Sequence, residues 1–233
     1  MKRRLLIADL GLIDYLKAHE LQLKLLDLRI REDIPDSFLL LEHPHVITLG
    51  RRAKNIDLKV PEIPVIKVER GGEATYHGPG QLIGYLIMGL RDLKLDIKRF
   101  VYLIEEAIIR ALRDFSIIGS RVQGYPGVWI RDKKIASIGL AIKHWVTYHG
   151  FALNVYPDMK YFKLIKPCGL EPSTMTSMEI ELGFKPDMTH VKESIIDHFK
   201  NLFGYDEAIR IEKISLESVL SRGSFELMDK SRI

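Results

Sequence analysis

Residues Ile117 to Val155 read IIGSRVQGYPGVWIRDKKIASIGLAIKHWVTYHGFALNV and contain four strand-like runs with no helical run among them. The runs are Ile117–Val122, Gly127–Arg131, Lys134–Ile142 and His149–Val155. Strands that follow one another in a block favour antiparallel neighbours, whereas alternating strands and helices would favour a parallel sheet. The block therefore predicts an α+β fold with a mixed, mostly antiparallel sheet flanked by helices.

The rest of the chain supplies further elements on both sides of this block. Apolar residues at helical spacing predict helices over 13–30, 97–115 and 189–203. Short apolar runs predict strands over 37–42, 46–49, 64–69 and 82–90, and residues 157–165 predict an irregular or short helical link. For the helix over 97–115 we expect an apolar face made of Phe100, Leu103, Ile104, Ala107, Ile108 and Leu112.

Composition and charge bound the class of protein. The chain has 233 residues, of which 46% are hydrophobic, so one sizeable core is expected. We predict a catalytic domain over 1–204 and a C-terminal tail or small extension over 205–233. The net charge of +4 is mild, and we expect no nucleic-acid partner; a basic surface equally suits an acidic protein.

The single cysteine and the N-terminus indicate the compartment. One cysteine cannot form an intramolecular disulfide, which fits a reducing environment. The N-terminus begins like a signal peptide, but Asp9 and Asp14 interrupt its apolar stretch and no small-residue cleavage site follows. No run approaches the length of a membrane span. We therefore expect a cytoplasmic protein with no membrane association.

Cys168 is the strongest candidate for a nucleophile. A lone cysteine is more often a small buried hydrophobe. Cys168, however, lies between Pro167 and Gly169, where proline fixes the backbone and glycine lets a substrate approach. A thiol with a reference pKa of about 8.5 needs a neighbouring cation or base in order to react at neutral pH.

Lys134 is the favoured candidate for activating this thiol. It follows Lys133 at the start of a strand, so the two side chains should point to opposite faces. Two exposed lysines at a hairpin would be the commoner arrangement, but a lysine turned inward would have a role there. The histidines offer an alternative base, in the form of a Cys–His dyad.

The segment Arg70-Gly-Gly-Glu-Ala-Thr-Tyr-His-Gly-Pro-Gly-Gln81 is rich in glycine, and we expect no regular element in it. It matches neither GxGxxG nor the Walker pattern, so nucleotide binding in those modes is not indicated. Backbone N–H groups that glycine exposes can bind an oxyanion or an acyl carbonyl. The apolar strand that follows would supply a wall for an acyl chain.

The eight histidines show no HExxH or CxxC-like spacing with the cysteine, so we expect no metal site. We also expect no cofactor.

Four segments, taken in order, resemble the lipoyl(octanoyl) transferases. They are the glycine-rich segment 70–81, Gly127–Ile130 with Lys134–Gly139, His149–Val155, and Pro167–Leu170 with Met175–Ser177. The resemblance covers about Leu39 to Ser177. It implies a fold like the catalytic domain of biotin and lipoate protein ligases. One position departs from the pattern: where the family often has arginine, this chain has Ala141.

The resemblance also implies a reaction and its residues. An octanoyl group would move from octanoyl-acyl carrier protein to a specific lysine of an apo lipoyl domain, in E2 subunits of 2-oxoacid dehydrogenases or in the glycine cleavage H protein. Cys168 matches the acyl-thioester cysteine, and Lys134 the lysine that lowers its pKa. The implied substrate-binding residues are Arg70, Gly71, Gly72, Glu73, Ala74, Thr75, Tyr76, His77, Ser137, Ile138, Gly139, Gly150, Phe151 and Ala152.

Two other functions remain alternatives at this point. An ATP-dependent lipoate–protein ligase would share the fold but would need no cysteine nucleophile. A non-catalytic protein could bind lipoyl domains or acyl carriers without using Cys168 or Lys134.

Overall fold

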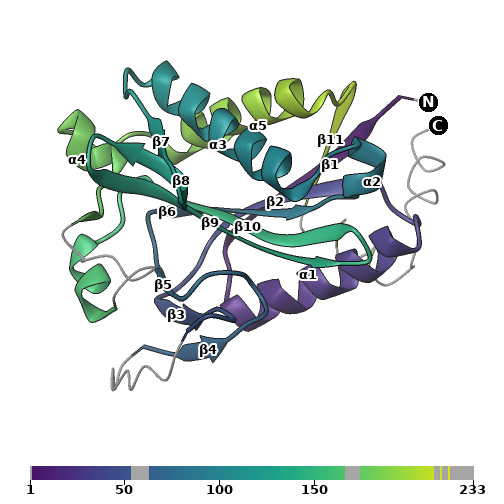
Figure 1. Cartoon of the computed structure of the whole chain (residues 1–233), viewed down its shortest axis with the longest axis horizontal. Coiled ribbons are helices and arrows are strands. Elements are labelled where there is room, and N and C mark those ends of the chain that lie inside the picture. The colour runs from purple at the N-terminus through teal and green to yellow at the C-terminus, as the bar shows by residue number, and fades with distance from the viewer. Residues whose placement is uncertain (1, 54–62, 166–173, 213–215, 217–219, 221–233) are drawn as a thin grey trace.

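The computed structural model describes residues 2–53, 63–165, 174–212, 216 and 220. Its main sheet has eight strands in the order β11-β1-β2-β6-β10-β9-β8-β7 (Figure 1). The strands are β1 (Arg4–Leu12), β2 (Asp36–Glu42), β6 (Gln81–Ile87), β7 (Ser120–Val122), β8 (Tyr125–Ile130), β9 (Lys133–Lys143), β10 (Val146–Asn154) and β11 (Glu207–Ile211). β1 runs parallel to β2 and β11, and the other neighbours are antiparallel. The predicted mixed, mostly antiparallel sheet is confirmed.

A second sheet of three strands lies below the main one in Figure 1. It consists of β4 (Val65–Lys67), β3 (Val46–Leu49) and β5 (Ala74–His77) in that order. β5 falls inside the glycine-rich segment, so the expectation that this segment holds no regular element is wrong. The glycines flank the strand rather than interrupt it, and Ala-Thr-Tyr-His between them pairs antiparallel with β3.

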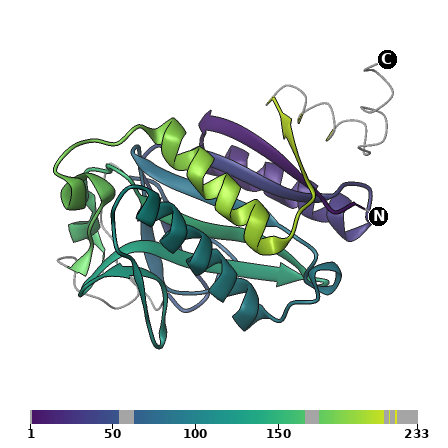
Figure 2. The ribbon, with the colours of Figure 1, turned by 90° about the horizontal axis from the view of Figure 1, so that it is seen from above.

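Helices cover both faces of the main sheet. Their bounds are α1 (Tyr15–Ile30), α2 (Leu90–Leu93), α3 (Ile97–Asp114), α4 (Met178–Leu182) and α5 (Met188–Phe203), with a 3₁₀ helix η1 (Met159–Leu164). α3 and α5 lie side by side on one face, as Figure 2 shows from above, whereas α1 lies on the opposite face together with the small sheet. Among the described helices, none has the length and apolar character that crossing a membrane requires.

The largest core lies between the main sheet and the α3–α5 layer. Asp96 caps α3 by accepting a hydrogen bond from Arg99 N–H, which fixes where the helix begins. The predicted apolar face is confirmed, because its six residues all belong to this core. β6 runs through the centre of the sheet, with Leu82 and Leu86 facing this core and Ile83 facing α1.

Several element boundaries differ from the sequence-based expectations. α1 begins at Tyr15 rather than Ile13, because Asp14 accepts hydrogen bonds from the N–H groups of Leu16 and Lys17 and so acts as the N-cap. The strand predicted to reach Leu90 ends at Ile87, since Leu90 begins α2.

β1 and β11 were not predicted as strands. They pair in parallel at one edge of the main sheet, where residues 4–8 of the N-terminal run lie opposite residues 207–211. The described part of the chain beyond residue 204 therefore contributes to the sheet. The predicted division into a domain over 1–204 and a tail over 205–233 stays a prediction.

Candidate active site

The glycine-rich loop is fixed to both sheets by Arg70 and by the backbone. The buried Arg70 guanidinium donates to Thr48 O at 2.7 Å, to Thr48 Oγ1 at 2.8 Å and to Gly71 O at 3.0 Å. Gly71 N–H donates to Leu140 O of β9 at 2.9 Å. Gly72 has φ +86°, a conformation that residues with a side chain rarely adopt. The loop thus joins β3 to β9 in one defined shape.

Side chains alternate along β5, as they must in a strand. Thr75 and His77 line a cavity on the α1 face of the main sheet. Ala74 and Tyr76 point the other way, into an apolar cluster with Ile47 of β3. Three of the predicted substrate-binding residues therefore lie outside the cavity wall: Glu73, Ala74 and Tyr76.

The cavity lies between the glycine-rich loop, α1 and the strands β6, β9 and β10. Its empty volume is about 500 Å³, including the open mouth. It brings together the other predicted substrate-binding residues, which are Arg70, Gly71, Gly72, Thr75, His77, Ser137, Ile138, Gly139, Gly150, Phe151 and Ala152. Three segments far apart in the sequence thus meet around one space, and its wall combines backbone polar groups with apolar side chains.

Four further residues line the cavity: Tyr15, Ile83, Tyr85 and His149. Ile83 and Tyr85 come from the strand that was expected to supply an apolar wall, and their i, i+2 spacing places them on one face. His149 begins the third segment of the resemblance, but it was not among the implied substrate-binding residues. Tyr15 carried no signal in the sequence, because α1 reaches the cavity through the fold alone.

His77 is held as a neutral acceptor at the cavity wall. Gln81 donates from Nε2 to Asn154 Oδ1 at 2.9 Å, so its Oε1 is the acceptor that faces His77 Nδ1 at 2.7 Å. Nδ1 must therefore carry the proton. Burial lowers the pKa of His77 to about 3, so its Nε2 is unprotonated at neutral pH.

A second buried histidine, His43, lies behind the cavity wall. His43 Nδ1 lies 2.8 Å from Ile13 O, which can only accept, so Nδ1 is the donor. Burial lowers the pKa of His43 to about 4, and the ring is neutral at pH 7. Its Nε2 then accepts from the Tyr85 hydroxyl at 2.7 Å. Burial also raises the pKa of Tyr85 well above its usual value, which keeps that hydroxyl as a donor.

Hydrogen bonds connect the cavity wall to Lys134. Asn154 Nδ2 donates to Thr176 O at 2.9 Å, and Thr176 N–H donates to Lys134 O at 3.0 Å. Met175 also forms a parallel bridge with Lys134. These contacts hold Met175 and Thr176 against β9.

The expected orientation of Lys134 is confirmed: its side chain is 3% exposed, whereas Lys133 points to solvent. Its Nζ lies 5.5 Å from the centre of the Trp129 ring. Gly127 makes room for the stem, because a Cβ there would lie 2.7 Å from Lys134 Cε. Lys134 does not line the cavity itself; it lies three residues before Ser137 on β9, roughly 10 Å along the strand.

Cys168 lies outside the described residues, together with its neighbours Pro167, Gly169 and Leu170. Its role as nucleophile and its pairing with Lys134 therefore stay predictions. The described chain resumes at Thr174, and Met175 meets Lys134 directly.

The model of the lipoyl protein ligase A/B catalytic domain matches residues 14–200, which includes the loop, the cavity and Lys134. The chain belongs to this family. The octanoyltransferase of Syntrophobacter fumaroxidans is 44% identical over 213 residues, covering 88% of this chain and 93% of the relative. The octanoyltransferase of Caldicellulosiruptor bescii is 45% identical over 207 residues, covering 85% and 91%.

Solved structures confirm the expected fold. A lipoate-protein ligase A bound with ATP superposes with a TM-score of 0.71 at 17% identity, covering 99% of this chain and 95% of that one. A biotin protein ligase from Aquifex aeolicus in complex with biotin and ATP gives a TM-score of 0.52 at 11% identity, covering 85% and 70%. At these identities the likeness shows the architecture alone.

Proposed function

We propose that this protein is an octanoyltransferase of protein lipoylation. It takes an octanoyl group from octanoyl-acyl carrier protein and transfers it to a specific lysine of an apo lipoyl domain, in E2 subunits or in the glycine cleavage H protein. The observation that carries the proposal is the cavity, whose apolar walls and polar backbone rim suit an acyl chain with a carbonyl head. Relatives at 44–45% identity over most of the chain are octanoyltransferases.

The first half-reaction moves the acyl group onto Cys168. Lys134 favours the thiolate, either through positive charge or by accepting the thiol proton. The thiolate attacks the carrier thioester, so a new C–S bond to Cys168 forms as the C–S bond to the carrier breaks. The carrier leaves as a thiol after taking up a proton. Backbone N–H groups near His77 and Gly78 stabilise the oxyanion. One thioester replaces another, so little free energy is lost.

The second half-reaction forms the product amide. The acceptor lysine attacks as a neutral amine, a C–N bond forms, and the Cys168 C–S bond breaks. Lys134 takes the proton that the amine nitrogen must lose. No oxidant, metal or nucleotide enters either step, because the thioester already supplies an activated acyl group.

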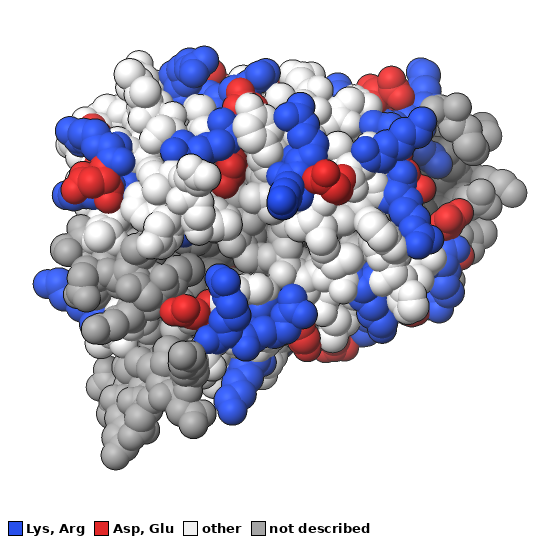
Figure 3. Space-filling view, viewed as in Figure 1, with Lys and Arg blue, Asp and Glu red and all other residues white. Residues whose placement is uncertain are grey.

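A basic surface beside the loop supports a protein donor with acidic side chains. Blue side chains gather in the lower centre of Figure 3, over the region of β3 and β4. Arg51, Arg52 and Lys67 are exposed there. Arg51 N–H donates to Arg70 O and Arg52 N–H donates to Gly72 O, both at 3.0 Å, so these two arginines are held at the edge of the glycine-rich loop. Such charges raise the association rate of an oppositely charged partner.

The test is a transfer assay without ATP, using octanoyl-acyl carrier protein and an apo lipoyl domain, followed by intact mass spectrometry. We expect octanoylation of the lipoyl domain and, when the acceptor is left out, an octanoyl adduct on Cys168. Cys168→Ser should abolish the transfer and lack this adduct, with an unchanged circular dichroism spectrum. Transfer that depends on ATP would favour a ligase, and normal turnover by Cys168→Ser would end the covalent mechanism.

A further inference from the structure

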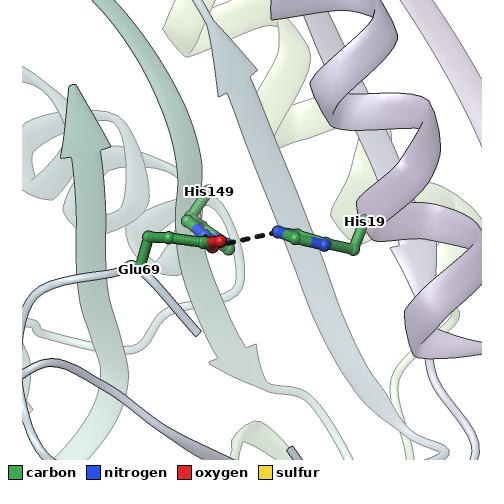
Figure 4. A group of neighbouring side chains, drawn as sticks. All are labelled: His19, Glu69 and His149. Carbon is green, nitrogen blue, oxygen red and sulfur yellow. Dashed lines mark hydrogen bonds and ion pairs between the residues drawn. The ribbon is translucent and has the colours of Figure 1, made fainter. Parts of the chain in front are cut away.

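Three side chains from separate elements lie close together, as Figure 4 shows, and one of them, His149, also lines the cavity. His19 comes from α1, His149 from β10, and Glu69 from the segment just before the glycine-rich loop. Glu69 Oε2 lies 3.1 Å from His19 Nε2 and 3.7 Å from His149 Nε2. The three candidate ligand atoms all lie within 4.8 Å of one another. Two imidazole nitrogens and one carboxylate oxygen thus lie close together, with the two rings nearly parallel at 19° and their centroids 5.6 Å apart.

The backbone of His149 holds its ring in this direction. His149 has φ +58°, in the left-handed region, although it lies within a strand and carries a side chain. Its N–H donates to Gln22 Oε1 of α1 at 2.8 Å. A non-glycine residue in this conformation costs on the order of 1 kcal/mol or more, and such costs concentrate at functional sites.

The ring nitrogen that points at Glu69 needs a partner. His149 is 2% exposed, and its Nε2 is buried without a hydrogen-bond partner among the described residues. A buried polar atom in this state costs free energy unless a ligand or ion satisfies it.

We propose that His19, Glu69 and His149 form a zinc site. Two histidines and one glutamate are a donor set that Zn²⁺ uses when the fourth position is left to water. Zn–N and Zn–O distances of about 2.0–2.1 Å place tetrahedral ligand atoms about 3.3 Å apart. Small rotations suffice to reach that spacing, because the Glu69 side chain is 53% exposed and the His19 side chain 18%.

Charge makes Glu69 the ligand on which binding depends most. The Arg70 guanidinium lines the same cavity as His149, and its positive charge repels a divalent cation. Glu69 is the one anionic member of the triad, and its carboxylate offsets that repulsion. Imidazole ligands suit zinc and disfavour the hard Mg²⁺ ion, so the site should distinguish the two metals.

The position separates the metal from Lys134. His149 pairs with Leu140 of β9, six residues from Lys134, which is roughly 20 Å along the strand. A metal there is too far away to act on a thioester beside Lys134. It would join α1, the start of the glycine-rich loop and β10 in one cross-link, and so fix the end of the cavity remote from Lys134.

The test is isothermal titration calorimetry of the full chain with Zn²⁺, after treatment with a chelator and its removal. We expect one equivalent of Zn²⁺ to bind and the melting temperature to rise with its concentration. Glu69→Gln and His19→Gln should each weaken binding at least tenfold. Cys168→Ser should leave it unchanged, which separates this site from thiol binding. Mg²⁺ in tenfold excess should not compete.

A matched control comes from a histidine–carboxylate pair that lacks a third ligand. His198 Nε2 lies 2.8 Å from Asp114 on the opposite layer, and His198→Gln should leave Zn²⁺ binding unchanged. Co²⁺ gives an independent readout, because its visible spectrum should indicate a tetrahedral nitrogen and oxygen site without a thiolate band. Any one of three results would overturn the proposal. The first is no saturable binding at 100-fold molar excess of Zn²⁺. The others are binding that is retained in both Glu69→Gln and His19→Gln, and binding that is lost in His198→Gln or Cys168→Ser.

Discussion

The two ends of β9 and β10 are built from the same pair of strands but provide opposite kinds of chemistry. At one end Lys134 brings an amine into a nearly closed environment beside Trp129. Toward the other end the cavity meets His149, which burial keeps neutral, together with Tyr15, whose pKa burial raises. The difference separates a group that can supply charge or take up protons from neutral histidine and tyrosine side chains, beside which the Arg70 guanidinium also lines the cavity. We infer that chemistry belongs to the first end and acyl-chain recognition to the second.

The largest expected effect comes from removing the amine at the first end. Lys134→Met keeps the length of the buried stem but removes both the charge and the base, so the thiol pKa should rise. Alkylation of Cys168 by iodoacetamide at pH 7 should slow by on the order of tenfold or more, since each pKa unit changes the thiolate fraction tenfold. The measurement is the alkylation rate as a function of pH, followed by mass spectrometry.

Lys133→Met is the matched control, because Lys133 is the neighbouring lysine on the exposed face of the same strand. It should leave the alkylation profile unchanged. Equal profiles for wild type and Lys134→Met would remove Lys134 from the mechanism and return attention to a histidine as the activating base.

The second prediction concerns the other end of the cavity and the length of the acyl chain. Each buried methylene contributes about 0.8 kcal/mol, so a chain two carbons shorter than octanoyl should lose about tenfold in kcat/KM. A chain two carbons longer should also react more slowly, because a cavity of defined length cannot hold two further methylene groups without overpacking. Rates that stay flat from four to twelve carbons would contradict a cavity of defined length.

Local sequence patterns predicted the strands on the Lys134 side of the site well. The alternation of Lys133 and Lys134, together with the strand character of residues 149–155, depends on neighbours in the sequence, and the structure confirms both. The buried apolar run over 82–90 likewise identified β6 as a wall. The Lys134 side of the site could therefore be approached from the sequence alone.

The remote end of the cavity could not be predicted in the same way. Tyr15 and His19 reach it from a helix whose pattern marks only an amphipathic surface, and Gln22 contacts His149 across 127 positions of the chain. Strand β11 was missed for a similar reason, because its pairing with β1 depends on tertiary packing rather than on local propensity. No short motif could reveal the His19–Glu69–His149 cluster either, since its members come from three distant segments.

The smallest expected effect concerns the protonation of His77 in the cavity wall. His77 is neutral in both the folded and the unfolded chain above pH 6.5, so it makes no pH-dependent contribution there. Below pH 6.5 the His77 side chain binds a proton in the unfolded chain, whereas in the folded chain it stays unprotonated until the pH approaches 3. The free energy of unfolding must therefore fall as the pH falls through this window, by about 1 kcal/mol for His77 at pH 5.5.

His77→Asn isolates this effect, because the asparagine amide can still donate to Gln81 in place of Nδ1. The variant should be less stable than wild type at pH 7.5, but it should lose less stability between pH 7.5 and pH 5.5. Urea unfolding at several pH values, with a chelator present to remove metal from His149, measures both quantities. His190→Asn, at an exposed histidine of α5, should keep the wild-type slope. If His77→Asn also kept that slope, His77 would be protonated in the folded protein well above pH 3, and it would not be the neutral acceptor that its burial and its hydrogen bond to Gln81 imply.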